Sequence, residues 1–352
     1  MTLTERIKAF IHLGNFLSQF AENQPHKKEN IPNNDLFFEG MLHQIKLAEE
    51  HNGWFTNENI RFAIKNWSEA LTENNLSAWV SVYSFDGKHP KTVAIIMAGN
   101  IPLVGFHDFL SVLISGNNVL VKQSTKDKQL LPYLAKYLEH IDSGFKKRIS
   151  FTEEQLADFD AVIATGSDNT ARYFEYYFKN KPHIIRKNRN SVAVLTGNET
   201  ESQLSALGED IFRYYGLGCR NVSKLMVPEN YNFDKFFNAI YPWHTLMDKH
   251  KYANNYDYNK AVYLMSEFKF LDNGFFMLKA DKGYSSPIAS CFYEYYSSIE
   301  SLKHQLRQDQ DQLQCIVSYG FTDGEVAFGQ TQQPDLWDYA DTINTLDFLL
   351  KI

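Results

Sequence analysis

Cys219 is the residue best placed in this sequence for covalent chemistry. It follows Gly216 and Gly218, which let the backbone approach a ligand closely, and it precedes Arg220, whose positive charge favours a thiolate. A thiolate is the nucleophile that acyl transfer requires. The alternative is a buried cysteine that acts as a small apolar side chain, a common role for cysteines outside disulfides.

Asn100 is a second candidate, as a hydrogen-bond donor in catalysis. It lies where a predicted buried strand turns into a helix, so its amide N–H groups would face a ligand at the helix N-terminus. A well-placed amide donor at a developing oxyanion accelerates acyl transfer about 100- to 1,000-fold. The alternative is a plain helix N-cap, since Asn is favoured at that position.

Gly166 and Ser167 are candidates for binding a nucleotide. They follow a predicted buried strand and open a helix, which suits a pyrophosphate that rests on backbone N–H groups. The sequence here has no complete GxGxxG pattern, so an ordinary strand-to-helix turn with a capping serine is the alternative.

Lys122 and Ser124 end a neighbouring predicted strand, at the edge where open α/β sheets bind nucleotides. No acidic residue between Lys122 and Lys126 is present to pair with a ribose 2′-hydroxyl, whereas two lysines could accept a 2′-phosphate. This pattern favours NADPH, with NADH as the alternative cofactor. A solvated lysine pair without a ligand is the structural alternative.

The segments around these residues predict a doubly wound α/β sheet. Residues 93–97 form an unbroken apolar run, which is typical of a strand buried on both faces of a parallel sheet. Strands and helices then alternate, with helices at residues 103–113, 131–140 and after 167 and strands at 119–121 and 161–164. Gly116 is the expected C-terminal stop of the first of these helices.

A chain of 352 residues exceeds the usual size of a single core, so we expect two lobes with a ligand cleft. The predicted organisation is a helical N-terminal segment packed on the nucleotide domain (1–85), a nucleotide-binding domain (86–194), a second α/β domain with Cys219 (195–318) and a C-terminal return or oligomerisation segment (319–352).

Composition excludes several classes of protein. The net charge of -7 and the absence of a long Lys/Arg block argue against nucleic-acid binding. The three cysteines show no paired spacing, which argues against disulfides and a metal site, and the apolar surroundings of Cys291 and Cys315 predict core positions. Polar residues interrupt the longest apolar region, 93–114, and no signal peptide is evident, so we expect a cytoplasmic protein without a membrane span.

Taken together, these residues resemble the aldehyde dehydrogenase superfamily and, within it, the acyl-CoA reductases related to the fatty acid reductase subunit of bacterial luminescence. The similarity runs from about Trp79 to the C-terminus, and the order of the motifs carries it. The matching segments are an asparagine-proline turn (97–103), a glycine-asparagine-valine-lysine strand (116–122), a nucleotide turn (165–167) and four segments typical of the reductase branch (186–191, 218–220, 328–334 and 338–341).

The resemblance implies an aldehyde dehydrogenase-like fold and an acyl-cysteine mechanism. Cys219 would attack a fatty acyl-CoA, an acyl-protein thioester or an acyl-adenylate, and a nicotinamide cofactor would reduce the acyl-enzyme to an aldehyde. Asn100 and the Cys219 backbone N–H would hold the oxyanions. The resemblance also implies a homo-oligomer and an acyl-protein synthetase as a partner.

One departure from the superfamily concerns water activation. The hydrolytic members carry a Glu before a Gly-Gly pair, whereas the stretch aligned with it, residues 194–198, has no glutamate. Its absence suits an enzyme that protects an acyl thioester from hydrolysis. A shift in alignment would bring Glu199 or Glu201 to that place. Ala171 also stands at the second glycine of the nucleotide turn, which predicts a different cofactor geometry there.

Two other functions fit the same motifs. A semialdehyde or acyl-phosphate reductase would need cations around a small anion, whereas the 27 Phe and 20 Tyr of this chain favour an acyl tunnel. A non-reducing acyl carrier or scaffold for an acyl-protein synthetase would be acylated on Cys219 without binding nicotinamide.

Overall fold

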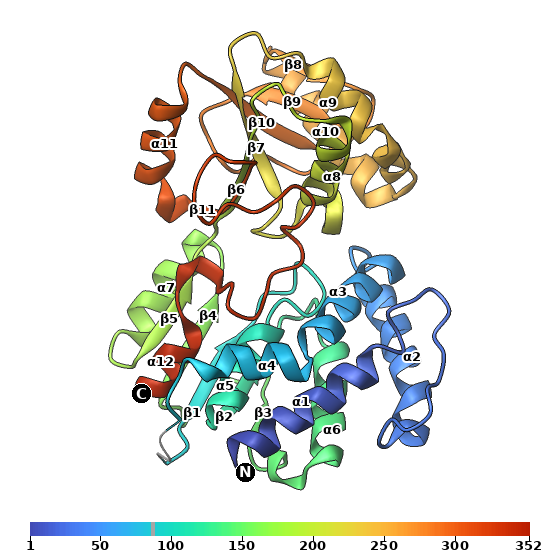
Figure 1. Ribbon diagram of the computed structural model, residues 1–352, viewed down its shortest axis with the longest axis vertical. Coiled ribbons are helices and arrows are strands. Elements are labelled where there is room, and N and C mark those ends of the chain that lie inside the picture. Colours follow the sequence, from blue (N-terminus) through green and yellow to red (C-terminus); the bar gives the residue numbers. More distant parts are fainter. Residues whose placement is uncertain (86–88) are drawn as a thin grey trace. The chain divides into compact units, whose positions relative to one another are not determined.

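The computed structural model describes residues 1–85 and 89–352, which form two compact units. Unit 1 contains Met1–Lys187 and Asp335–Ile352, and unit 2 contains Asn188–Pro334. Each unit is built around its own sheet, and each sheet is covered by helices (Figure 1). The predicted α/β class and the helical N-terminal segment are therefore confirmed.

The sheet of unit 1 has five parallel strands in the order β3-β2-β1-β4-β5. The strands are β1 (Thr92–Ile96), β2 (Asn118–Lys122), β3 (Ile149–Phe151), β4 (Ala161–Thr165) and β5 (His183–Arg186). Val93 and Ile95 point into the large core of this unit, whereas Ala94 points into a smaller core on the opposite face. Both faces of β1 are buried, as its unbroken apolar run predicts.

Helices cover both faces of this sheet. The large core contains side chains from α5 (Phe106–Ser115) and α6 (Leu130–Ile141), and the smaller core contains Phe174 and Phe178 of α7 (Asp168–Phe178). The connections that follow β1 and β4 therefore lead to opposite faces, which is the doubly wound arrangement. Helix α5 ends at Gly116 in the left-handed conformation (φ 90°), as expected from the sequence.

The N-terminal helices extend the large core of unit 1. They are α1 (Leu3–Leu17), α2 (Asn34–His51), α3 (Asn57–Ala70) and α4 (Glu73–Ser81). Phe10, Leu13 and Phe16 of α1 are fully buried, and the Arg6 side chain donates from Nε to the Ile114 carbonyl at the end of α5 (3.0 Å). The expected boundary at 85/86 adjoins residues 86–88, which lie outside the described residues.

A buried ion pair fastens the C-terminal segment to unit 1. Arg186 at the end of β5 bonds the Asp108 carboxylate (2.6 Å from Nη2 to Oδ1) and donates to Thr345 Oγ1 and to the Ala340 carbonyl (both 2.8 Å). Helix α12 (Thr345–Lys351) packs on α5. The guanidinium group thereby joins three parts of the unit that lie far apart in the sequence.

The sheet of unit 2 has six strands in the order β11-β6-β7-β10-β9-β8. All neighbours pair in parallel except β8 and β9, which are antiparallel. The strands are β6 (Asn190–Val194), β7 (Val222–Pro228), β8 (Phe270–Asp272), β9 (Met277–Ala280), β10 (Ser290–Tyr296) and β11 (Leu313–Val317). Its helices are α8 (Glu201–Phe212), α9 (Phe233–Ile240), α10 (His250–Met265) and α11 (Ile299–Gln308). Short 3₁₀ helices lie at Ser143–Phe145, Arg213–Gly216, Tyr241–Asp248, Gln310–Gln312 and Ala340–Thr342.

The boundary between the units differs from the expected one. It lies after Lys187, before β6, whereas the sequence placed it after residue 194. The C-terminal segment rejoins unit 1 at Asp335 instead of beginning at 319. Strands β5 and β6 are both short apolar runs, and their sequences do not reveal that β5 pairs with β4 while β6 pairs with β7 and β11.

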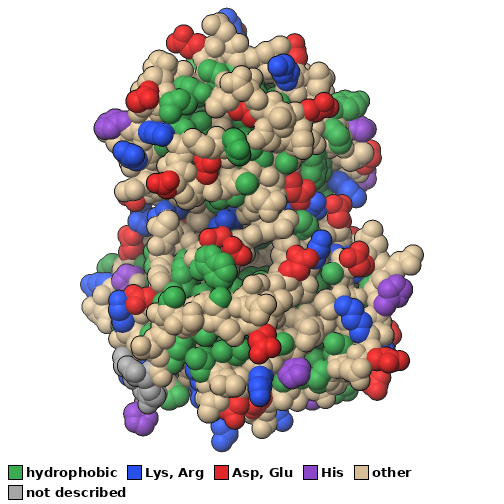
Figure 2. Space-filling view, in the orientation of Figure 1, with side chains coloured by type: hydrophobic (Ala, Val, Ile, Leu, Met, Phe, Trp, Pro, Cys, Tyr) green, Lys and Arg blue, Asp and Glu red, His purple; other side chains and the backbone are tan. Residues whose placement is uncertain are grey.

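The helices and the surface charges concern two expectations from the sequence, those about a membrane span and about nucleic-acid binding. None of the helices in the described ranges combines the length and apolar character that crossing a bilayer requires. Lys and Arg side chains lie interspersed with Asp and Glu on the face shown in Figure 2. Positive charge is therefore dispersed on that face.

Replacement of Asp108 tests the importance of the buried ion pair. Asp108→Ala leaves the Arg186 guanidinium buried without its carboxylate, so we expect a loss of about 3–5 kcal/mol in the free energy of unfolding. Denaturant titration followed by circular dichroism measures this loss. In the control, Asp35→Ala removes an exposed ion pair and should leave the unfolding midpoint nearly unchanged. Equal effects of the two variants would contradict the assignment.

Candidate active site

Most of the predicted site residues of unit 1 lie at the carboxyl edge of its sheet, where β1, β2 and β4 end. Ile96 pairs with Lys122 on one side and with Ala164 on the other, so the loops after β1, β2 and β4 start at the same level. Because the chain leaves β1 and β4 towards opposite faces, this edge is the topological switch point at which such sheets bind nucleotides.

The loop with Asn100 rests directly on the loop after β2. A Cβ on Gly99 would lie 2.6 Å from Ser124 Oγ, so the approach of the two loops requires a glycine there. Ser124 Oγ also accepts the Lys126 N–H (3.2 Å). Lys122 donates from Nζ to the Glu154 carbonyl (2.8 Å), so its ammonium group is directed to the backbone in this structure.

Gly166 and Ser167 join β4 to α7. Ser167 is the N-cap of α7 and accepts the Thr170 N–H (3.4 Å), which matches the alternative of a capping serine. A Cβ on Gly166 would lie 3.0 Å from Phe174 Cε2 and Thr170 Cβ, so glycine allows β4 to end close to the helix. The N-terminus of α7 lies at the edge where a pyrophosphate would need it, and the residues fit a bound dinucleotide. Ala171, at the position of the second glycine, is fully buried.

Asn100 is not the N-cap of α5, so that alternative is wrong. The helix begins at Phe106 with Gly105 as its N-cap, and a turn separates Asn100 from it. Leu103 in this turn has a left-handed backbone (φ 57°), which costs a non-glycine residue roughly 1–2 kcal/mol. Its N–H donates to Asp127 Oδ2 (3.3 Å), and its carbonyl accepts the Phe106 N–H (3.0 Å). Asn100 is half-buried.

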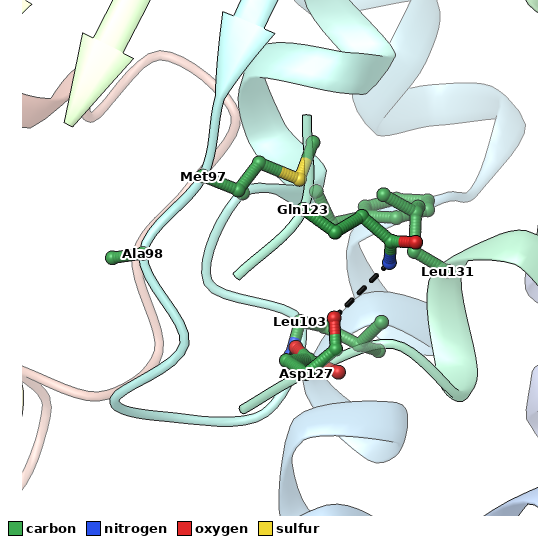
Figure 3. Close-up of a pocket in the computed structure, with 8 residues that line it drawn as sticks. Met97, Ala98, Leu103, Gln123, Asp127 and Leu131 are labelled. Atoms are coloured by element: carbon green, nitrogen blue, oxygen red, sulfur yellow. Dashed lines mark hydrogen bonds between the residues drawn. The ribbon is translucent and has the colours of Figure 1, made fainter. Parts of the chain in front are cut away.

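Asp127 lies in a small cavity beneath this turn, which sequence reasoning missed (Figure 3). The cavity has a volume of about 10 Å³, close to that of one water position, and its lining comes from Met97, Ala98, Leu103, Gly105, Phe106, Gln123, Asp127 and Leu131. Asp127 Oδ1 is buried and accepts no hydrogen bond from the described residues. Burial raises the pKa of Asp127 to about 6, and the Leu103 N–H opposes this shift.

Cys219 is exposed in unit 2, whereas Cys291 and Cys315 are buried, as expected for core residues. Between α8 and Cys219 the chain passes through three successive left-handed residues, Tyr214 (φ 54°), Tyr215 (φ 61°) and Gly216 (φ 75°). Both tyrosine side chains are buried. Left-handed backbone at two bulky residues stores strain, and such strain is concentrated at functional sites.

Hydrogen bonds from separate segments hold the loop that carries Cys219. Ser191 Oγ in β6 donates to the Cys219 carbonyl (3.0 Å), and Arg220 donates from Nε to the Thr331 carbonyl (2.6 Å). Arg220, which we expected to favour the thiolate, thus anchors the loop to the C-terminal part of unit 2.

The segment 328–334, singled out by the sequence, is fixed in turn by Asp210 of α8. The Asp210 carboxylate accepts the Gly329 N–H (2.6 Å) and both the N–H and the hydroxyl of Thr331 (2.9 and 2.8 Å). Burial raises the pKa of Asp210 to about 6, although these hydrogen bonds lower it. Sequence reasoning did not identify Asp210, because an aspartate inside a helix resembles a solvated residue.

Neither Glu199 nor Glu201 lies next to Cys219. Strands β6 and β7 run parallel. Cys219 precedes β7 and lies at the amino ends of these strands, whereas both glutamates follow β6 and lie at the carboxyl ends. The seven residues of β7 separate the two ends by about 20 Å. Glu199 instead accepts the Thr196 and Gly197 N–H groups (2.6 and 3.0 Å). Residues 194–198 are therefore the wrong stretch to compare with the Glu-Gly-Gly segment. The stretch that enters β6 beside Cys219, 187–191, contains no acidic residue.

Comparisons with known proteins agree with this architecture. The model of the acyl-CoA reductase (LuxC) family matches residues 18–242 of this chain. The comparison with curated proteins gave no match.

Several solved structures share the fold. Aldehyde dehydrogenase 21 from Physcomitrella patens, in complex with its product succinate, has a TM-score of 0.69 at 11% identity, over 100% of this chain and 84% of that chain. An aldehyde dehydrogenase from Mycobacterium tuberculosis complexed with NAD+ has a TM-score of 0.64 at 14% identity, over 91% and 73% of the two chains. An NAD+ complex of an aldehyde dehydrogenase from Bacillus cereus has a TM-score of 0.62 at 13% identity, over 91% and 72%.

The raised pKa of Asp127 predicts a pH-dependent change in stability. An unfolded aspartate titrates near pH 3.9, roughly two units lower. The folded state therefore holds the proton more tightly, and this contribution to stability is complete below about pH 4 and lost as the pH rises through 6.

Asp127→Asn removes this titration, so its stability relative to wild type should increase from pH 4 to pH 8 by up to roughly 3 kcal/mol. Urea unfolding of both proteins at pH 4, 6 and 8 measures the difference. A difference that stays constant with pH would show that Asp127 does not titrate in this range.

Proposed function

The chain belongs to the acyl-CoA reductase (LuxC) family and has the aldehyde dehydrogenase fold, and on this premise we propose that it reduces an activated acyl group to an aldehyde through a thioester on Cys219. Family and fold support an oxidoreductase that acts on acyl or aldehyde groups. The observation that carries the finer proposal is the exposure of Cys219 on a strained, hydrogen-bonded loop, while the other two cysteines are buried.

Acyl transfer is the first step. The Cys219 thiolate attacks the acyl carbon, a C–S bond forms, and the carbonyl electron pair moves to the oxygen. The side-chain amide of Asn100 and the backbone N–H of Cys219 stabilise this oxyanion. The oxyanion then collapses and expels the leaving group, which is the coenzyme A thiolate when the donor is an acyl-CoA.

Aldehyde release is the second step. A bound nicotinamide dinucleotide would supply the hydride that converts the acyl thioester into a thiohemiacetal. Asn100 and the Cys219 N–H hold the second oxyanion as they hold the first. When this oxyanion collapses, the C–S bond breaks, the aldehyde leaves, and the electron pair of that bond restores the Cys219 thiolate.

The dinucleotide would bind at the carboxyl edge of unit 1. The N-terminus of α7, with Gly166 and Ser167, would receive the pyrophosphate, and Lys122 and Ser124 would lie near the adenosine. NADPH is the proposed cofactor, because no carboxylate between Lys122 and Lys126 is available for a ribose 2′-hydroxyl.

The surroundings of Cys219 suit a reductase better than a hydrolytic enzyme. No acidic residue occurs in the stretch that enters β6 beside Cys219, and Glu199 is committed to its own turn at the far edge of the sheet. Without a base to activate water, the thioester would persist until hydride arrives. We propose a fatty acyl-CoA as the donor, with an acyl-protein thioester or acyl-adenylate from a synthetase partner as the alternatives.

Replacement of the nucleophile is the direct test. Wild-type protein with a long-chain acyl-CoA and NADPH should form an aldehyde, and without NADPH it should gain the mass of one acyl group on Cys219. Cys219→Ser should abolish the aldehyde and the adduct, while Cys291→Ala, at a buried cysteine, should keep both. Mass spectrometry and aldehyde trapping provide the two measurements.

Three other results would redirect the proposal. Acylation without nicotinamide binding would indicate an acyl carrier, and faster turnover of short anionic substrates would indicate a semialdehyde or acyl-phosphate reductase. Aldehyde formation by Cys219→Ser would exclude the covalent mechanism.

Replacement of Asn100 tests the oxyanion donor. Asn100→Ala should lower kcat for acyl-CoA reduction by about 100- to 1,000-fold with a smaller change in KM, because the lost hydrogen bond forms mainly in the transition state. Steady-state kinetics measures both constants. Asn15→Ala, at an exposed position of α1, is the control and should keep wild-type rates. Unchanged kcat in Asn100→Ala would remove Asn100 from the mechanism.

A further inference from the structure

Asn221 is a buried residue that connects the Cys219 loop to the end of α8. Its side chain is 2% exposed although it lies two residues after an exposed cysteine. An amide buried in this way must find hydrogen-bond partners for its donor and acceptor groups. In this structure the partners lie on two different segments.

The donor side of the amide caps a helix. The last carbonyls of an α-helix have no partner within the helix, and the left-handed turn after Phe212 prevents α8 from continuing. Asn221 Nδ2 donates to the carbonyls of Asp210 (3.0 Å) and Arg213 (2.8 Å). The side chain thus accounts for carbonyls that have no partner within the helix.

The acceptor side holds the residue before the nucleophile. Asn221 Oδ1 accepts the Gly218 N–H (2.8 Å), and the Asn221 backbone N–H donates to the Gly218 carbonyl (3.1 Å). The Gly218 carbonyl and the Cys219 N–H belong to one peptide group, in which they point in opposite directions. The bond to the Gly218 carbonyl, which fixes the direction of the Cys219 N–H, comes from the Asn221 backbone, and the side-chain bonds to α8 and to the Gly218 N–H hold that backbone in place.

A second residue holds the peptide group on the other side of Cys219. Ser191 Oγ donates to the Cys219 carbonyl (3.0 Å), which fixes the peptide group that links Cys219 to Arg220. Both peptide groups that flank the nucleophile are therefore fastened, one by the Asn221 backbone N–H and the other by Ser191 of β6.

We propose that Asn221 is a positioning residue that orients the Cys219 backbone N–H as an oxyanion donor and thereby sets the rate of acyl transfer. The inference rests on the proposed function, because it assigns a role within that reaction. Asn221 touches no reacting atom in this scheme and acts only through the peptide group of Cys219. Ser191 supports the same orientation from the opposite side.

This role predicts different effects on two reactions of the same thiol. Acyl transfer passes through an oxyanion and requires the oriented N–H, whereas alkylation by iodoacetamide displaces iodide and forms no oxyanion. A defect in orientation should slow acylation selectively. Loss of thiol access should slow both reactions, whereas loss of folding should abolish nicotinamide binding and expose Cys291 and Cys315 to alkylation.

The experiment compares Asn221→Ser with wild type in pre-steady-state acylation by a long-chain acyl-CoA, in iodoacetamide alkylation and in nicotinamide binding. A serine keeps the backbone N–H but is too short to span α8 and Gly218, so the bond to the Gly218 carbonyl loses its support and acylation should slow by about tenfold. Alkylation should stay within about threefold, since it depends on thiolate content and access. Asn259→Ser is the matched control, because Asn259 is also buried and donates to a backbone carbonyl, that of Ile288, and it should keep wild-type acylation.

Ser191→Ala provides a second test of the same orientation if Asn221→Ser does not fold. It removes one hydrogen bond beside Cys219 and should slow acylation about tenfold, with alkylation little changed. Equal slowing of both reactions, or unchanged acylation in both variants, would overturn the inference. A wild-type protein that forms no acyl-Cys219 would instead overturn the proposed function, and the wild-type arm distinguishes the two failures.

Discussion

The strained reversal of the chain before Cys219 is the constraint on which the proposed site depends. Tyr214 and Tyr215 adopt left-handed backbone that costs roughly 1–2 kcal/mol per residue, and the turn also leaves the last carbonyls of α8 without partners within the helix. Hydrogen bonds to Asn221 and the burial of both tyrosine rings offset this cost. The result is an exposed thiol on a backbone that cannot relax independently of unit 2.

Unit 1 uses the same physical solution for the other proposed oxyanion donor. The turn that carries Asn100 passes through left-handed Leu103, whose N–H is held by Asp127 in a water-sized cavity. In both units a buried polar side chain fixes the backbone of a loop that carries a proposed site residue. The raised pKa values of Asp127 and Asp210 show that burial, which disfavours the charged form, outweighs the hydrogen bonds these carboxyl groups accept.

The proposed preference for reduction over hydrolysis rests on the absence of acidic residues from the stretch that leads into β6 beside Cys219. A water-activating base must lie within hydrogen-bond reach of its water, whereas Glu199 and Glu201 lie at the far edge of the second sheet. Residues 187–191, which lead into β6, are lysine, asparagine, arginine, asparagine and serine. This distribution supports transfer of the acyl group to hydride over transfer to water.

The sequence alone determined the features that depend on neighbouring residues. The apolar run of β1, Gly116 after α5 and the order of motifs that places the chain in its family all follow from local periodicity, caps and residue type. Tertiary structure decided which sheet β6 joins, that Asn100 is not a helix cap, and which edge of the sheet Glu199 occupies. It also revealed Asn221 and Asp127, whose roles arise from burial and from partners on other segments. Strand pairing and burial are set by contacts between residues distant in the chain, which local pattern does not encode.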